Sequence, residues 1–205
     1  MLWPSAFVLS QWLAANPSFV LSKRVLELGA GCGLSGLVAA RLMKLHSSPS
    51  QKSEVILTDF NKIVQENLLR NVTLNNVTDI CTVIGLNFYD QVGNTDKWKD
   101  TNGNLHEPVD VVLAADVICQ PDDAYSTANS IHDALKPGGN AFVISANAAH
   151  RFGVEYFVDA CKRVNLNVQA NEVGDDLLTE DMKHASGYVP GMQLTMFKIS
   201  KPMKS

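Results

Sequence analysis

The chain has 205 residues, of which 46% are hydrophobic and 19% are charged, and its formal net charge is −4. This length fits one domain that can bury a hydrophobic core, so we expect a single domain over residues 1–205. The acidic balance argues against a nucleic-acid-binding protein, because neutralising phosphates requires clustered Lys and Arg.

The cysteines and histidines argue against a metal site or a disulfide framework. The four cysteines are widely spaced and form no Cys-x-x-Cys pair: Cys32, Cys81, Cys119 and Cys161. This usage suits a reducing compartment, and the histidines show no metal-ligand spacing. We therefore expect no bound metal and a cytoplasmic location, with entry into the nucleus left open.

The first 22 residues carry no charged side chain and could be mistaken for a membrane anchor. They lack a basic leading segment, however, and polar residues interrupt the apolar run. Pro4 suits the first turn of a helix, and Pro17 ends it. Because Leu9 and Leu13 share one helical face, we expect residues 1–22 to form a helical segment packed on the core, with no membrane contact.

Apolar stretches then alternate with amphipathic ones through the rest of the chain. Strands are expected at residues 24–28, 55–58, 82–86, 109–115, 140–146, 166–172 and 193–199. Helices are expected at residues 34–45, 63–75, 122–136 and 152–164. Strands that are apolar throughout, separated by amphipathic helices, predict a doubly wound α/β fold with a mostly parallel sheet covered on both faces.

Three connecting segments have distinctive composition. Residues 90–108 read as a polar, Gly- and Asn-rich loop, inserted and mobile. The sequence "LKPGG" at residues 135–139 predicts the turn between the third of these helices and the fifth strand. Residues 174–191 are either a lid or a surface loop.

The stretch "VLELGAGCGLSG", residues 25–36, predicts an anion-binding loop. Glycines after a strand and before a helix let the backbone turn sharply and point its N–H groups at an anion. Gly29, Gly31 and Gly33 spell the GxGxG pattern of S-adenosylmethionine sites, and Gly31, Gly33 and Gly36 spell the GxGxxG pattern of dinucleotide sites. The glycines alone therefore do not name the ligand.

Other residues favour S-adenosylmethionine over a dinucleotide. Asp59 follows the second strand, where an acid meets the ribose hydroxyls of either ligand. Glu27 lies inside the first strand, and a buried acid is costly unless it meets a hydrogen-bond network or a cationic group such as a methionine ammonium. A dehydrogenase also needs substrate-binding machinery, for which 205 residues leave no room.

Four motifs carry a family resemblance. In this order, "ELGAGCG", "TDF", "LAADV" and "LKPGG" resemble the class I, seven-strand S-adenosylmethionine-dependent methyltransferases over nearly the whole chain. The opening "LWPSAFVLSQWL" is similar to that of the lysine-methyltransferase-like protein methyltransferases. The resemblance implies one methyltransferase domain, a seven-stranded sheet with an antiparallel last strand, S-adenosylmethionine as cofactor with S-adenosylhomocysteine as product, and a protein substrate. We also expect a monomer.

The resemblance also implies which residues hold the cofactor. The glycine loop would hold its methionine end, Asp59 its ribose, and Asn87 and Phe88 its adenine, although many members have an acid followed by Trp at these two positions. The expected cofactor-binding residues are Trp3, Glu27, Gly29, Gly31, Gly33, Asp59, Phe60, Asn87, Phe88 and Ala115.

Asp116 is the expected catalytic residue, because the fourth strand of the class I fold ends beside the transferred methyl group. Lysine-specific members usually show Asp-x-x-Tyr, whereas this chain has Cys119 at the Tyr position. Asp122 and Asp123 could hold an arginine acceptor, or they could merely begin a helix. With Cys119 they are the candidate substrate residues. We expect transfer to a protein side-chain nitrogen, with lysine as the first expectation, arginine as the alternative and a silent cofactor-binding module as the third reading.

Overall fold

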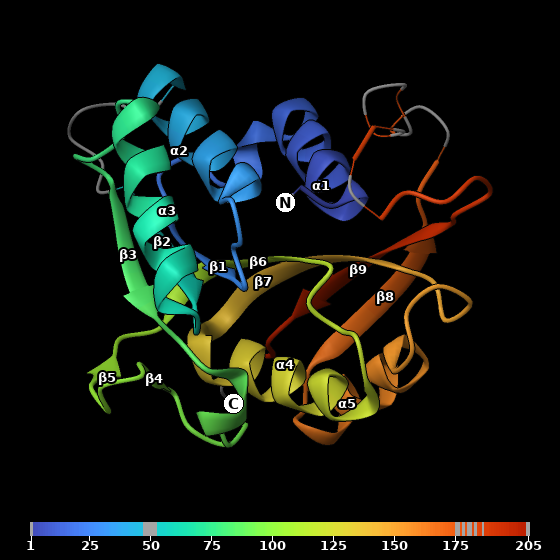
Figure 1. Ribbon diagram of the computed structural model, residues 1–205. Coiled ribbons are helices and arrows are strands. Elements are labelled where there is room, and N and C mark those ends of the chain that lie inside the picture. Colours follow the sequence, from blue (N-terminus) through green and yellow to red (C-terminus); the bar gives the residue numbers. More distant parts are fainter. Residues whose placement is uncertain are drawn as a thin grey trace.

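The computed structural model describes residues 2–46, 53–174, 177, 179, 182, 184–185 and 187–203 (Figure 1). Within these residues, seven strands form one sheet in the order β3-β2-β1-β6-β7-β9-β8. The strands are β1 (Arg24–Leu28), β2 (Glu54–Asp59), β3 (Cys81–Gly85), β6 (Val109–Ala115), β7 (Leu135–Ala146), β8 (Asn167–Glu172) and β9 (Leu194–Ser200). Only β9 in this sheet runs antiparallel to its neighbours. The predicted fold class is therefore confirmed.

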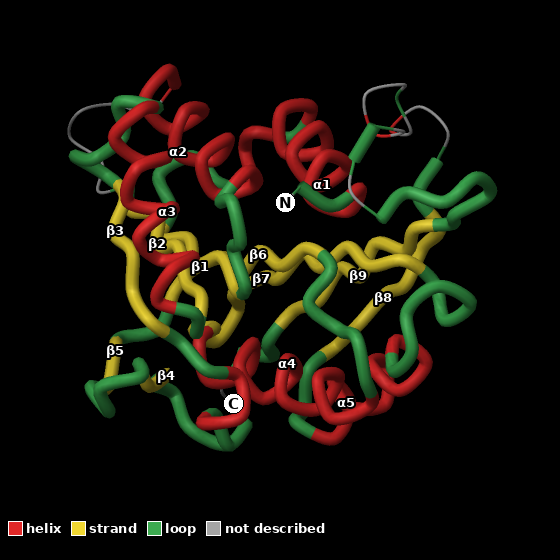
Figure 2. Tube along the Cα trace, viewed as in Figure 1, coloured by secondary structure: helices red, strands yellow, loops and turns green. Residues whose placement is uncertain are grey.

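Helices cover both faces of the sheet, as Figure 2 shows. One face is covered by α1 (Pro4–Ala15), α2 (Leu34–His46) and α3 (Lys62–Leu74), and the other by α4 (Pro121–Ala134) and α5 (Phe157–Arg163). Side chains alternate between the two faces along a strand. In β1, Val25 accordingly joins the core under α1 and α2, and Leu26 joins the core over α4 and α5. Both faces need apolar residues, which explains the near-continuous apolar strands.

The N-terminal segment packs on the sheet as a helix, as the sequence predicts. Leu9 and Leu13 of α1 are fully buried, and a short 3-10 helix, η1 (Pro17–Phe19), follows. None of the described helices is both long enough and apolar enough to span a membrane.

Two predicted boundaries are wrong. Helix α4 ends at Ala134, and "LKPGG" already belongs to β7 because it pairs with the chain's last described segment: Gly138 N–H donates to the Lys201 carbonyl over 2.9 Å. The helix expected from residue 152 is shorter. Gly153 has a left-handed φ of 101°, and a 3-10 turn, η3 (Val154–Tyr156), precedes α5.

Residues 90–108, expected as a polar, mobile loop, contain some regular structure. After the 3-10 turn η2 (Phe88–Asp90), this segment forms a small antiparallel hairpin of β4 (Trp98–Lys99) and β5 (Leu105–His106). Trp98 is fully buried and stacks on His106, with ring centroids 4.1 Å apart. One large aromatic residue thus anchors a segment whose composition is otherwise polar.

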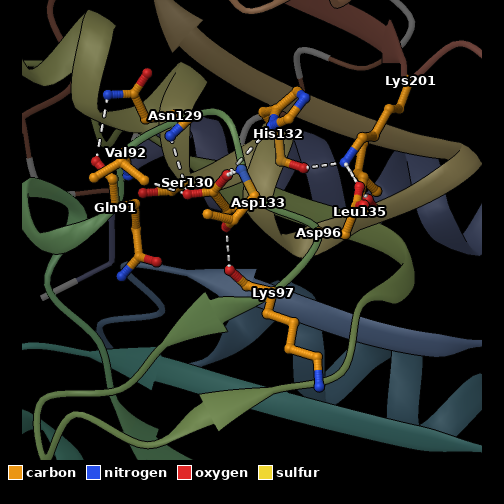
Figure 3. A network of polar contacts seen from close by, with 12 residues as sticks. Gln91, Val92, Asp96, Lys97, Asn129, Ser130, His132, Asp133, Leu135 and Lys201 are labelled. Carbon is orange, nitrogen blue, oxygen red and sulfur yellow. Dashed lines mark hydrogen bonds and ion pairs between the residues drawn. The ribbon is translucent and has the colours of Figure 1, made fainter.

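A buried carboxylate ties the same segment to α4 (Figure 3). Asp133, 1% exposed, accepts backbone hydrogen bonds from Val92, Gly93 and Thr95 at 2.9–3.0 Å. Burial opposes ionisation, but His132 and these N–H groups outweigh it and hold the pKa of Asp133 below its ordinary value. The segment after η2 is therefore fixed to the end of α4.

Candidate functional site

A cavity of about 420 Å³ opens at the carboxyl ends of the parallel strands. Gly29 follows β1, Asp59 ends β2, Leu86 follows β3 and Asp116 follows β6, and all four line it. The full lining is Gly29, Asp59, Phe60, Leu86, Asn87, Phe88, Tyr89, Asp116, Val117 and Asp123. This edge of an open α/β sheet is where ligands bind, so it is the candidate site.

The glycine loop lines the cavity through Gly29, which has no side chain. Gly29 has a φ of 58°, and a Cβ atom there would lie 2.9 Å from a methyl carbon of Val117. A Cβ atom on Gly31 would meet no heavy atom within 4 Å, so that position faces open space. A larger residue at position 29 would clash with Val117, which explains why a glycine is needed there.

Asp59 joins the glycine loop to the start of α3. One carboxylate oxygen accepts the Gly31 N–H at 3.3 Å, and the other accepts the Asn61 N–H at 3.0 Å. The N-cap of α3 is Asn61, whose side chain accepts from the N–H groups of Ile63 and Val64. Asp59 itself is therefore not the helix cap. Phe60 beside it is 71% exposed at the cavity mouth.

The cavity lining contains a residue that sequence reasoning missed. Asn87 and Phe88 line the cavity, and Tyr89 lines it beside them. The Tyr89 hydroxyl donates to Asp123 Oδ1 at 2.5 Å and accepts from Gln120 Nε2 at 2.9 Å. The Asp123 hydrogen bond is the main cause of the raised pKa of Tyr89. Tyr89 and Asp123 lie 34 positions apart, so no local pattern could reveal this pair.

The three candidate substrate residues are placed differently by the structure. Asp123 lines the cavity and accepts the N–H groups of Cys119 and Gln120, in a capping box that begins α4. Asp122 and Cys119 are exposed and lie outside the lining. The helix-start reading of Asp122 and Asp123 therefore describes their local structure.

Asp116 lies at the end of β6 with a left-handed φ of 60°, an uncommon conformation for a residue other than glycine. Its side chain is 3% exposed. Arg151 Nε donates to Asp116 Oδ1 at 2.8 Å, and Nη2 donates to Oδ2 at 2.5 Å. The same guanidinium lies 4.9 Å from the centroid of the Trp3 ring. Sequence reasoning named Asp116 and Trp3 as site residues, but it did not predict that Arg151 contacts both of them.

Glu27 lies beneath the glycine loop, outside the cavity lining. It is 2% exposed, and its Oε2 accepts the Gly36 N–H at 2.9 Å in the first turn of α2. Burial raises the pKa of Glu27 from 4.5 to about 8, although hydrogen bonds from Gly36 and Ser35 lower it in part. The other expected cofactor residues outside the lining are Trp3, Gly31, Gly33 and Ala115.

Residues 174–191 fall only partly within the described residues. Those described include Gly187, which packs against Trp3 so closely that a Cβ atom would lie 2.2 Å from its ring. In the part of the chain that the structure describes, no group of three or more His, Cys, Asp or Glu side chains could hold a metal ion.

Solved structures share this fold at low sequence identity. An S-adenosylmethionine-dependent methyltransferase from Aquifex aeolicus superposes with a TM-score of 0.62 at 11% identity, covering 93% of this chain and 88% of that one. A putative sarcosine dimethylglycine methyltransferase from Galdieria sulphuraria gives a TM-score of 0.60 at 12% identity, covering 95% and 86%.

Curated relatives are closer in sequence. The histone-arginine methyltransferase METTL23 of Xenopus laevis is 33% identical over 126 residues, covering 60% of this chain and 45% of the relative. The protein-lysine N-methyltransferase EFM3 of Chaetomium thermophilum is 29% identical over 176 residues, covering 81% and 47%. The chain thus spans less than half the length of these two relatives. A sequence model of the family described as "Lysine methyltransferase" matches residues 1–163. The chain therefore belongs to the lysine methyltransferase family.

Proposed function

We propose that this chain transfers a methyl group from S-adenosylmethionine to a side-chain nitrogen of a protein, with lysine as the acceptor. The observation that carries the proposal is the cavity itself. It brings together the glycine loop, the acid that ends β2 and the acid that follows β6, in a member of the lysine methyltransferase family. EFM3, a relative over 81% of this chain, is a protein-lysine methyltransferase.

The residues that line the cavity fit this cofactor. The Gly29 backbone leaves room that a Cβ atom would fill, and the Asp59 carboxylate offers acceptors to ribose hydroxyls. Leu86 and Phe88 supply an apolar wall for a purine, and Asn87 supplies a polar edge. When bound, S-adenosylmethionine supplies a sulfonium methyl group that passes to a nucleophilic nitrogen and leaves S-adenosylhomocysteine.

The residues of this chain position the acceptor nitrogen and supply a negative charge beside it. Methyl transfer requires an acceptor nitrogen held in line and shielded from water. Asp116 is a buried carboxylate in the cavity lining, where it can orient a cationic side chain and assist loss of its proton. Val117 and Phe88 form apolar wall beside it, which limits the approach of water.

Arginine is a second candidate acceptor, and one observation favours it. Asp116 holds the guanidinium of Arg151 through two parallel hydrogen bonds, so the site already has the geometry that a guanidinium needs. The METTL23 relative, a histone-arginine methyltransferase, adds to this alternative.

The test is transfer of labelled methyl groups from S-adenosylmethionine to proteins of a cell extract. Asp116→Ala should abolish the labelled band, whereas Asp159→Ala, an exposed acid on α5, should leave it unchanged. Mass spectrometry of the band then identifies lysine or arginine. A wild-type protein that binds S-adenosylmethionine but labels nothing would contradict the proposal and favour a silent binding module.

We also propose that the protein acts as a monomer in the cytoplasm. The widely spaced cysteines, none of which forms a disulfide within the described residues, support a reducing compartment. Light scattering on the purified protein tests the monomer, and imaging of a tagged protein tests the location. A dimer mass or an exclusively nuclear signal would contradict the respective statement.

A further inference from the structure

The carboxylate at the candidate reaction centre is already occupied. Both oxygens of Asp116 accept hydrogen bonds from Arg151, at 2.8 and 2.5 Å, and the Asp116 side chain is 3% exposed. While this pair is intact, Asp116 has its charge neutralised and its best hydrogen-bonding positions filled. An acceptor nitrogen that needs Asp116 must therefore compete with Arg151.

The contacts of the Arg151 side chain resemble those of a bound cationic ligand. Its guanidinium meets a carboxylate and an indole face, the two groups that proteins combine to bind cationic side chains. These two groups come from distant elements, since Trp3 precedes α1 and Asp116 follows β6. The packing of Gly187 against the indole fixes the position of Trp3. Together they form a built site for a cation.

The guanidinium can leave this site without unfolding a helix or strand. Arg151 lies between β7 and η3, and its backbone is held separately: its N–H donates to the Asn147 carbonyl at 2.9 Å. Asn147 is fixed in turn to Gln193 through backbone and side-chain hydrogen bonds. Rotation of the Arg151 side chain alone would release Asp116.

We propose that Arg151 is a specificity-determining residue that occupies the acceptor site and yields it only to a cationic side chain of the protein substrate. This inference rests on the proposed function. Exchange of one cation for another keeps the buried carboxylate paired, whereas a neutral side chain would leave it uncompensated, at a high cost. The site therefore admits lysine or arginine and rejects neutral acceptors.

The first test compares Arg151→Met with Arg163→Met. Arg163 is a matched control, because its guanidinium also lies over an aromatic ring, 5.0 Å from the centroid of Tyr125, but away from the cavity lining. Methyl transfer is measured against the concentration of extract protein, and S-adenosylhomocysteine binding is measured by calorimetry. If Arg151 fills the site about nine-tenths of the time, Arg151→Met should lower the apparent KM about tenfold with kcat little changed. Arg163→Met should change neither.

The second test needs no activity. The Nε–H resonance of Arg151 is followed by NMR while methylguanidinium or methylammonium is added, with Asp116→Asn as the reference for a released arginine. Displacement should move the Arg151 signal toward its position in Asp116→Asn and leave the Arg163 signal in place. Urea, a neutral molecule of similar shape, should have no effect.

The outcomes separate this inference from the proposed function. A lower KM in Arg151→Met, or displacement by either cation, supports the inference. The inference is overturned if neither cation moves the Arg151 signal and the KM of Arg151→Met is unchanged or higher. Arg151 would then be a fixed support of Asp116. Failure of the wild-type protein to bind S-adenosylhomocysteine would instead overturn the proposed function.

Discussion

Glu27→Gln should remove a specific dependence of stability on pH. The Glu27 pKa rises on folding from 4.5 to about 8 because its carboxyl is buried. The stability that protonated Glu27 contributes is fully present below pH 4.5 and is lost as the pH rises toward 8. A shift of about 3.5 pH units at about 1.4 kcal/mol per unit corresponds to about 5 kcal/mol. Gln is uncharged at every pH and keeps an oxygen that can accept the Gly36 N–H.

Urea unfolding of both proteins between pH 5.5 and 7.5 measures this effect. Across these two pH units the wild type should lose about 3 kcal/mol relative to Glu27→Gln. The exposed acid Asp159, changed to Asn, is the control and should follow the wild type. A constant difference between wild type and Glu27→Gln would refute the reasoning, because it would mean that Glu27 is ionised in the folded protein throughout this range.

Three further variants test the packing and the cavity. Gly36→Ala should destabilise the fold by about 1–3 kcal/mol in urea unfolding, since the new Cβ atom would clash with Leu57; unchanged stability would contradict the packing of α2 on β2. Asp59→Ala should weaken S-adenosylmethionine binding about 10- to 100-fold by calorimetry, whereas Asp159→Ala should not; equal affinities would remove Asp59 from the site. Asp133→Ala leaves three backbone N–H groups without their acceptor, so it should lower the free energy of unfolding in urea by about 3 kcal/mol or more. Asp133→Asn keeps one acceptor oxygen and should cost less than half of that.

The sequence predicts the sheet and much of the cavity because both follow from local patterns. Apolar strands followed by glycine or an acid place Gly29, Asp59 and Asp116 at one edge of a parallel sheet, and the structure brings all three to the cavity. The boundary error at "LKPGG" is not local, because this segment pairs with the distant segment around Lys201, and no local propensity reports that pairing.

The missing parts of the site are contacts between distant residues. Arg151 and Asp116 are 35 positions apart, and Tyr89 and Asp123 are 34 positions apart. Each looks like an ordinary loop or helix-start residue in its own segment. Trp98 is similar, since a single buried aromatic residue in a polar stretch gives no periodic signal. Such pairs become visible only when the chain is folded.

The two walls of the cavity differ in how freely they could be redesigned. The wall at Tyr89 is tied to both ends of α4, through Asp123 at its first turn and through the Val92–Asp133 hydrogen bond at its last. Phe60, which also lines the cavity, is 71% exposed, so shortening it removes little buried contact. An enzyme engineered to use a cofactor analogue with a bulkier nucleoside should therefore be widened by Phe60→Ala, with the residues around Tyr89 left unchanged.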